Sequence, residues 1–166
     1  MLAPGPHLRD CVRLESRACD AEGFGTWIPT GSEMVILLRT PQHTLVYAPS
    51  IDCAFFAAPA FLISCPAHTA LMGQFLVEHG MPRILVFDAL RIANTDLRGT
   101  DPALRYAQID HAWFAGGTVV KQWCGDAQAL KGAIASGEFS PPHPIRCLAI
   151  LGPNPEQVGE AQAPPR

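Results

Sequence analysis

The sequence predicts an α+β domain built mainly from antiparallel strands, with helices inserted late in the chain. Apolar, β-rich runs follow one another between residues 33 and 90 with short turn segments between them, which is the pattern of a meander of adjacent strands. Two segments with helical start signals then appear after residue 100, and a last apolar run occupies residues 145–151. Strands first and helices later are typical of the α+β class.

The first predicted element is a helix within residues 7–22, where apolar residues recur at spacings of three and four. Five β-rich runs follow it, and they cover residues 33–39, 43–48, 52–64, 69–78 and 83–90. The turn "TPQ" joins the first two runs as a hairpin, and Pro59 breaks the third.

Start and stop signals define the later elements. Asp101 and Pro102 form a cap and first turn for a helix that continues as "ALRYAQIDHA". Asp126 and Gly137 flank a second helix, "AQALKGAIAS". Strands are expected at residues 117–123 and 145–151. The predicted domains are an N-terminal segment with a helix at 1–22, a folded domain at 23–151 and a disordered proline-rich tail at 152–166.

Composition and charge exclude several classes of function. Hydrophobic residues make up 48% of the chain and charged residues 16%, which excludes a disordered body. The net charge of -3 provides no overall basic field to hold a long nucleic acid by its phosphates. Prolines interrupt the longest apolar run before it reaches the ~18 residues of a membrane span, so no membrane contact is expected.

The six cysteines form no CxxC pair and no regular framework. Because the chain begins without a signal-peptide pattern, this predicts free thiols in a reducing compartment, and hence an intracellular protein of the nucleus or cytoplasm. Cys65 and His68 have no second pair at metal-ligand spacing. No metal site and no cofactor are therefore predicted.

Four consecutive stretches carry a resemblance to a known family. They are "HTALMGQFLVE", "PRILVFDALRIANTDLRGTDPALRYAQI", "VVKQWCGDAQALKGAIASGEF" and "PPHPIRCLAIL". Their order resembles the nucleotidyltransferase domain shared by mRNA capping enzymes, ATP-dependent DNA and RNA ligases and the cap-binding domain of snurportin. That domain presents a strand ending in K-x-D-G, a strand with D-G-E, a strand with an aromatic residue and aspartate, and a last strand with E-G or D-G. The family's C-terminal oligonucleotide-binding (OB) domain has no counterpart in this sequence.

At the positions that are catalytic in the family, this sequence has different residues. Aligned on its strand, the lysine motif falls at "RTPQ", where Arg39 replaces the nucleophilic lysine and Gln42 the glycine. Met72 and Gln74 replace the two acids of D-G-E, and Arg146 replaces the acid of the last strand. Arginine stays protonated and cannot attack phosphorus, and neutral side chains cannot hold a metal against phosphates. We expect no catalytic residue in this chain.

On the same resemblance, the residues expected to bind a nucleotide are Arg39, Gln42, Gln74, Phe87 and Arg146. The candidates for stacking a methylated guanine are Trp27, Trp113 and Trp123, because a cationic base gains ~0.5 to 2 kcal/mol on an indole face. Ordinary structural roles compete with each of these. A phenylalanine or tryptophan in a strand is usually core, a strand-end arginine can be solvated, and a glutamine can be satisfied within a sheet.

Three hypotheses for function remain open at this point. The leading one is a catalytically inactive nucleotidyltransferase-like protein that binds a nucleotide or capped RNA end, most plausibly an mRNA cap or guanosine-type ligand. The second is an active, divergent guanylyltransferase or ligase that uses a displaced lysine, Lys121 or Lys131. The third is a structural subunit or scaffold that binds a protein partner and whose cleft is filled by side chains such as Phe55, Phe56 or Met72.

Overall fold

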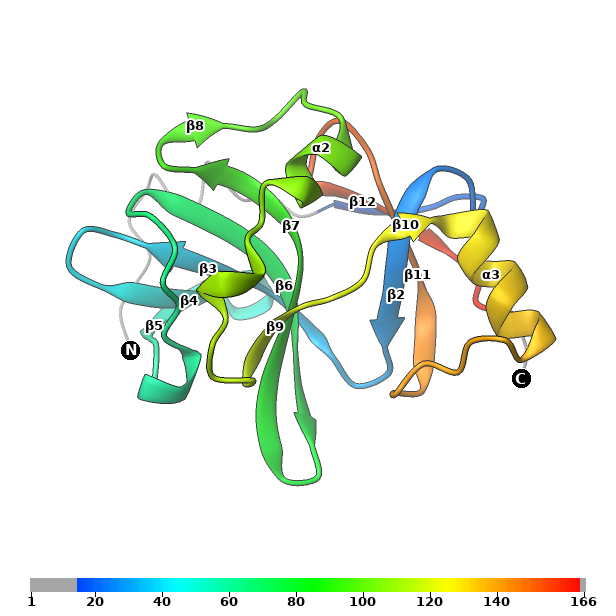
Figure 1. Cartoon of the computed structure of the whole chain (residues 1–166), viewed down its shortest axis with the longest axis horizontal. Coiled ribbons are helices and arrows are strands. Elements are labelled where there is room, and N and C mark those ends of the chain that lie inside the picture. The colour runs from blue at the N-terminus through cyan, green and yellow to red at the C-terminus, as the bar shows by residue number, and fades with distance from the viewer. Residues whose placement is uncertain (1–14, 165–166) are drawn as a thin grey trace.

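The computed structural model describes residues 15–164, which form two β-sheets with helices on their outer faces (Figure 1). We call the larger one sheet A. Its strand order is β5-β4-β3-β6-β7-β8, and β9 pairs with β7 off this path. The bounds are β3 Glu33–Arg39, β4 Thr44–Ala48, β5 Cys53–Phe56, β6 Thr69–Glu78, β7 Met81–Ile92, β8 Thr95–Asp96 and β9 Val119–Lys121. All pairs in sheet A are antiparallel except β7 with β9.

The smaller sheet, sheet B, has the order β1-β12-β11-β2-β10. Its strands are β1 Glu15–Ala18, β2 Phe24–Pro29, β10 Gly125–Asp126, β11 Ile145–Leu151 and β12 Gln157–Ala161. Here only β1 and β12 are parallel. The α+β class with mainly antiparallel strands is therefore confirmed.

Two α-helices, α2 Pro102–Ala107 and α3 Ala127–Ser136, accompany three single turns of 3-10 helix, η1 Pro49–Ile51, η2 Pro59–Phe61 and η3 His111–Trp113. Helix α3 has the predicted bounds because its caps act as expected. The Asp126 side chain accepts a hydrogen bond from the Gln128 N–H at 3.3 Å, and Gly137 adopts the left-handed conformation at φ 81°. Helix α2 is shorter than predicted, because the chain leaves the helix after Ala107 and forms η3 instead.

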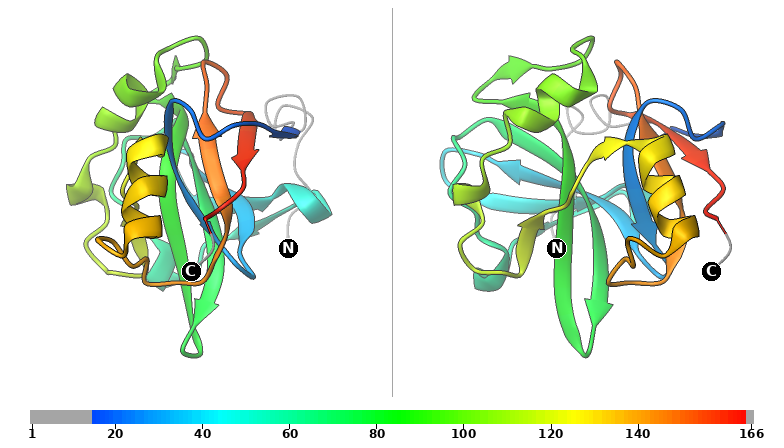
Figure 2. Two further views of the ribbon diagram at one scale, coloured as in Figure 1. Left: turned by 90° about the vertical axis from the view of Figure 1, so that its right-hand side faces the viewer. Right: turned by 45° about the vertical axis from the view of Figure 1, so that its right-hand side comes forward.

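Figure 2 shows the layers of the fold, and three clusters of apolar residues join them. The central cluster lies between the sheets and includes Ile36, Met72 and Phe87 of sheet A with Ile28 and Ala149 of sheet B. A second cluster covers the outer face of sheet A under η3 and β9. The third joins sheet B to α3. Along β6, even-numbered residues such as Met72 point to the central cluster and odd-numbered residues such as Leu71 point outward, as the period of two requires.

The predicted helix and tail at the two ends of the domain need correction. Residues 7–14 of the predicted helix lie outside the described range, but residues 15–18 form strand β1 because they pair with β12. The predicted disordered tail is wrong for residues 157–161, which form β12 between β1 and β11. The backbone of β12 forms hydrogen bonds with two neighbouring strands. This pairing is long-range, so local composition does not predict it.

Strand β2 was not predicted, because Gly25 and Pro29 weaken its β pattern. Gly25 is required by the fold: a Cβ at this position would overlap the backbone carbonyl of Ala149 on the paired strand β11. The same residue that hides the strand in the sequence lets β2 and β11 approach closely.

A buried ion pair links the two sheets. Asp88 of β7 and Arg105 of α2 are both fully buried, and Nε and Nη2 of Arg105 donate to the two carboxylate oxygens at 2.9 and 3.0 Å. Arg105 also donates from Nη1 to the carbonyls of Thr100 (2.6 Å) and Pro153 (3.2 Å), and from Nη2 to that of Gly152 (2.7 Å). All five N–H donors of the guanidinium therefore have acceptors. The pair connects β7, the start of α2 and the turn between β11 and β12.

None of the helices within residues 15–164 is long and apolar enough to cross a lipid bilayer. The five cysteines of this range are free thiols, and burial raises the pKa of the Cys65 and Cys147 thiols to about 11. Cys65 and Cys147 are buried, so they act as small apolar residues in the core rather than as reactive groups.

Replacement of Arg105 by methionine should lower the free energy of unfolding by about 3–5 kcal/mol, because it leaves the Asp88 carboxylate buried without its partner. The matched control is Arg98→Met. Arg98 is partly exposed and pairs with Asp96 at 2.7 Å and with Glu156 at 3.4 Å, and loss of each such pair costs about 0–1 kcal/mol. Urea unfolding of both variants measures the difference. Equal losses would contradict a central role for the buried pair.

Candidate functional site

The candidate site is the corner where the chain crosses from sheet B to sheet A. Strand β2 ends at Pro29 and β3 begins at Glu33, so residues 30–32 form the crossing. Thr30 donates its N–H to the Pro144 carbonyl at 2.8 Å, which ties the corner to the segment before β11. The Ser32 hydroxyl lies 2.8 Å from Gln74 Oε1 and 2.7 Å from the Pro29 carbonyl, so it connects the crossing to the central strand β6.

A small pocket opens beside this corner between the two sheets. Its volume is about 120 Å³, and it is lined by Ser16, Ile28, Met34, Gln74, Arg146, Val158 and Glu160. Two residues that the resemblance selected, Gln74 of β6 and Arg146 of β11, meet here although they are far apart in the sequence. Gln74 is 2% exposed and held by Ser32, whereas Arg146 is exposed and lies 3.5 Å from Glu160.

The rest of the space between the sheets is filled. Met72 and Phe87 are both fully buried in the central cluster, where they pack with Ile36, Tyr47 and Leu151 among others. Ligand pockets of proteins usually measure about 300–1,000 Å³, so the corner pocket is well below the common size. Phe87 is therefore a core residue in this structure, with no open face on which a base could stack.

Arg39 and Gln42, also predicted to bind a nucleotide, lie elsewhere. Arg39 is the last residue of β3 and pairs with Thr69, whereas Gln74 pairs with Met34 near the start of β3. Five residues of strand separate these positions, or roughly 17 Å at 3.4 Å per residue. Gln42 is exposed in the β3–β4 turn. The prediction that these residues share one site with Gln74 is wrong, since Arg39 and Gln42 lie at the end of β3 that is far from Gln74.

The three tryptophans also lie apart from the corner pocket and from one another. Trp27 is buried against α3 and packs on Phe139 with ring centroids 5.4 Å apart. Trp113, in η3, packs on Phe114 at 6.4 Å over the outer face of sheet A. Trp123 is 48% exposed, and its indole covers Gly125, where a Cβ would come within 2.5 Å of the ring. Only Trp123 of the three presents much of its ring to solvent.

Neither lysine lies at the corner pocket. Lys121 Nζ donates to the Ile109 carbonyl at 2.7 Å and lies 4.1 Å from the centre of the Tyr106 ring, a cation–π contact. Burial lowers the pKa of Lys121, which favours the free amine, but Lys121 does not line the corner pocket. Lys131, on α3, borders a shallow, open hollow of about 500 Å³ with Asp20 and Glu22.

A second polar contact joins the sheets next to the corner, beside the hydrogen bond from Thr30 to Pro144. His143 Nε2, before β11, lies 3.1 Å from Glu78 Oε2 at the end of β6, and Arg83 donates to the same carboxylate oxygen at 3.0 Å. The hydrogen bonds from His143 and then Arg83 lower the pKa of Glu78. These contacts hold the β6–β7 hairpin against the segment that precedes β11.

The sequence interpretation missed residues 30–32, Ser16 and Glu160. Residues 30–32 follow a strand that was not recognised, and the other two lie on β1 and β12, in segments predicted to be helix and tail. The dipeptide "TG" after Pro29 is a turn signal that marks the crossing, although it does not indicate where the next strand leads. The pocket therefore depends on strand pairing that local patterns do not show.

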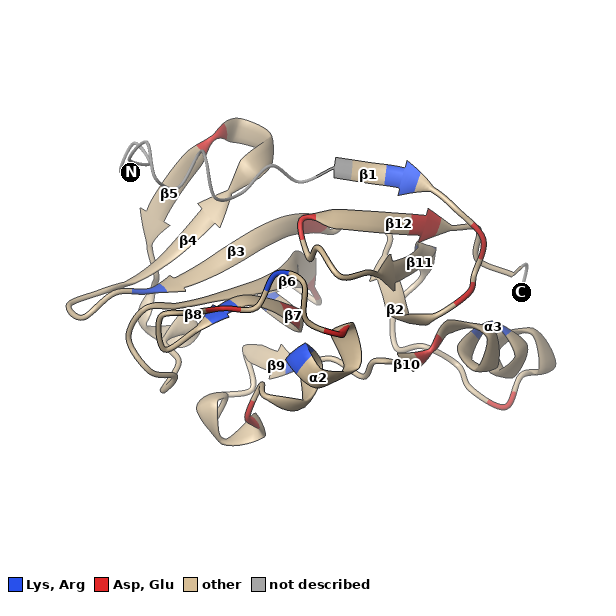
Figure 3. Ribbon diagram, turned by 90° about the horizontal axis from the view of Figure 1, so that it is seen from above, with Lys and Arg blue, Asp and Glu red and all other residues tan. Residues whose placement is uncertain are grey.

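The charged side chains that line the corner pocket are Arg146 and Glu160, which pair with each other. Lysine and arginine are scattered over both sheets and helices (Figure 3), and within residues 15–164 no group of three or more histidine, cysteine or acidic residues is placed to hold a metal ion. Comparison with known proteins adds no assignment: no protein-family model and no curated protein sequence matches the chain.

Replacement of Met72 by alanine should lower the free energy of unfolding by about 2–5 kcal/mol, because it leaves a cavity between the sheets. Met81→Ala is the matched control. Met81 is 64% exposed at the β6–β7 hairpin, and its truncation should cost less than about 0.5 kcal/mol. Thermal and urea unfolding measure both changes. A Met72→Ala variant as stable as the wild type would mean that the inter-sheet space is not filled as described.

Proposed function

We propose that this chain is a catalytically inactive nucleotidyltransferase-like protein that serves as a structural or scaffolding subunit and acts through a protein partner. One observation carries the proposal: Met72, Phe87 and their neighbours fill the space between the sheets, where a substrate of this class would have to lie. The corner pocket of about 120 Å³ is too small for a nucleotide when the two sheets are arranged as in this structure.

The chemistry of the corner supports the same proposal. If the strand that ends in the family's lysine motif corresponds to β2, then Thr30 takes the place of the nucleophile and Ser32 that of the aspartate. This alignment differs from the one at residues 39–42, and it places the motif beside Gln74 through the Ser32 hydrogen bond. Neither alignment supplies an amine that could attack a phosphate.

A nucleotide ligand remains the second candidate, because Gln74 and Arg146 meet at the corner pocket as the resemblance implied. A guanidinium and an amide could recognise a phosphate and a base edge. Against this stand the pocket volume and the Glu160 carboxylate, which pairs with Arg146 and would repel a phosphate. A bound nucleotide would require the two sheets to separate at the corner.

Labelling with nucleotide tests catalysis directly. Incubation with GTP or ATP labelled at the α-phosphate, in the presence of Mg²⁺, should give no acid-stable protein adduct, because no free amine lies at the corner. An adduct that disappears in Lys121→Ala or Lys131→Ala, but not in both, would identify a displaced nucleophile. That result would replace the proposal with the hypothesis of an active, divergent enzyme.

Calorimetric titration separates the two binding hypotheses. GTP, ATP and a methylated cap analogue should each show no saturable binding at millimolar concentration, because the corner cannot admit them. Saturable binding that weakens at least tenfold in Arg146→Ala, and not in the control Arg91→Ala, which lies outside the pocket, would favour a nucleotide ligand and remove the scaffold proposal.

A further inference from the structure

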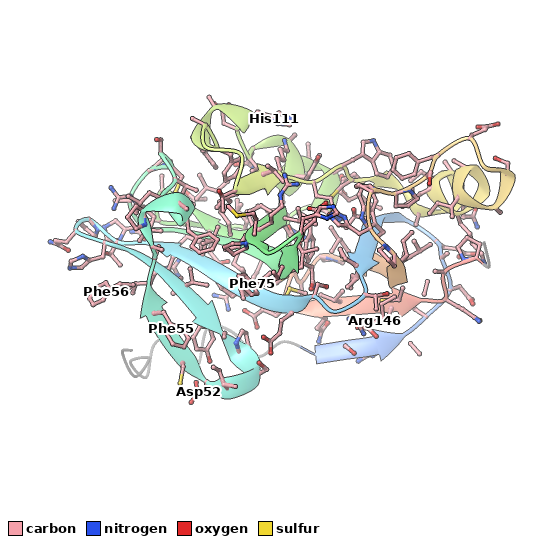
Figure 4. All side chains as sticks on the ribbon, turned by 90° about the horizontal axis from the view of Figure 1, so that it is seen from below. Asp52, Phe55, Phe56, Phe75, His111 and Arg146 are labelled. Atoms are coloured by element: carbon pink, nitrogen blue, oxygen red, sulfur yellow. The ribbon has the colours of Figure 1, made fainter. Side chains whose placement is uncertain are left out.

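An apolar groove lies on the outer face of sheet A, on the far side of that sheet from the corner pocket. Its volume is about 320 Å³, within the usual range for a binding pocket. It is lined by Glu33, Val35, Val46, Ala48, Ile51, Phe55, Phe56, Ala57, Ala58, Phe61, Phe75 and Ile84. Figure 4 places Phe55 and Phe56 at one end of the molecule and Arg146 toward the other.

The groove borders an open edge of sheet A. Within residues 15–164, β5 pairs only with β4, and no strand covers its other edge. The Ala57 N–H donates to the Thr44 carbonyl at 2.9 Å, so Ala57 and, by alternation, Phe55 direct their backbone groups toward β4. The N–H and C=O of Ala54 and Phe56 consequently point to the open edge.

Side chains at this edge are apolar and exposed. Ile51 is 59% exposed, Phe55 36% and Phe56 54%, and β5 itself, "CAFF", has no charge. Unpaired backbone groups beside exposed aromatic rings form the arrangement that accepts an added strand, with main-chain hydrogen bonds for affinity and a pocket for specificity.

The available area argues against a second copy of this chain as the occupant. An aromatic side chain buries about 150–250 Å² in total, so these three partly exposed side chains offer on the order of 300 Å². A stable dimer usually needs about 800 Å² from each partner. The patch is the right size for a short segment rather than for a folded subunit. Glu33, the one charged residue of the lining, favours a basic residue on that segment.

We propose that this groove binds a short, extended segment of a partner protein, which adds to β5 as an edge strand and places a large apolar side chain against Phe55 and Phe75. A side chain on the added strand that faces the same way as Phe55 would lie about 5 Å from it, at the rim of the groove. The inference rests on the proposed scaffold function, because it names the surface through which a partner would bind.

Selection of random twelve-residue peptides displayed on phage against the full chain provides the probe. The selected sequences should alternate large apolar residues with polar ones and include lysine or arginine. Synthetic versions should bind the wild type and lose at least tenfold in affinity with Phe55→Ser and with Ile51→Ser. Leu104→Ser is the matched control, since Leu104 is 58% exposed and lies outside the groove. Circular dichroism establishes that each variant is folded, and the two groove variants are independent of each other.

The backbone contribution is measured with the same peptides. N-methylation at alternate residues should abolish binding at one set of positions and leave it unchanged at the other, and amide chemical shifts of Ala54 and Phe56 should move on titration. Failure to select any peptide would overturn the inference, as would binding that is insensitive to both groove variants. A dimer in sedimentation that Phe55→Ser dissociates would replace the peptide by a second copy. If no peptide binds at the groove, the scaffold proposal still holds, but the partner must bind at another surface. Nucleotide binding measured by calorimetry would overturn the scaffold proposal whatever the peptide result.

Discussion

The buried pair between Asp88 and Arg105 determines how the two sheets are placed. A guanidinium removed from water is costly unless every donor has an acceptor, and Arg105 meets this condition only when the carboxylate of β7 and the carbonyls of Gly152 and Pro153 are all present. One set of acceptors belongs to sheet A and the other to the turn that leads into β12 of sheet B. The pair can therefore form only in the native arrangement of the sheets. The pair also explains why an aspartate lies within the buried part of β7 and why a helix follows the strand closely: the helix carries the partner of Asp88.

A fixed arrangement of the sheets has a consequence for the space between them. The central cluster includes side chains from both sheets, with Met72 and Phe87 fully buried, so the sheets contact each other through apolar packing rather than across a solvent-filled cleft. The polar groups of the corner satisfy one another, Ser32 with Gln74 and Arg146 with Glu160. A site that performs phosphoryl transfer needs unsatisfied groups aimed at a substrate. Here the polar groups at the corner bond to one another and so stabilise the fold itself.

The sequence predicts those elements whose signals are local. Strands β3, β6 and β11 and helix α3 have the predicted bounds, because alternation, apolar runs and caps are properties of neighbouring residues. Strands β2 and β12 are not predicted, because each contains a glycine that is required by a contact with a residue far away in the sequence. Gly25 lies against Ala149, and a Cβ at Gly159 would come within 2.6 Å of Cys19 Sγ. The missed β2 in turn explains the misplaced site. Because the lysine motif is aligned on β3, the prediction places Arg39 and Gln42 in one nucleotide site with Gln74, although most of a strand separates them from it. Gln74 and Arg146 both line the corner pocket, and the strands that carry them, β6 and β11, have the predicted bounds.

The two edges of sheet A are treated differently, and the difference bears on function. The edge beyond β7 is formed by two short strands, β8 with two residues and β9 with three. Arg98 donates hydrogen bonds to the Asp96 carboxylate of β8 that lower the pKa of this group to about 2, so Asp96 keeps its charge in all but strong acid. Short length and fixed charge are the usual protection against pairing with another chain. At the other edge β5 has neither a charge nor a covering element in the described part of the chain, and it exposes two phenylalanines beside a groove. An open apolar edge of this kind promotes aggregation unless a specific partner covers it. A fold that protects one edge and leaves the other bare is best explained if the bare edge has an occupant, and the size of the patch limits that occupant to a short segment.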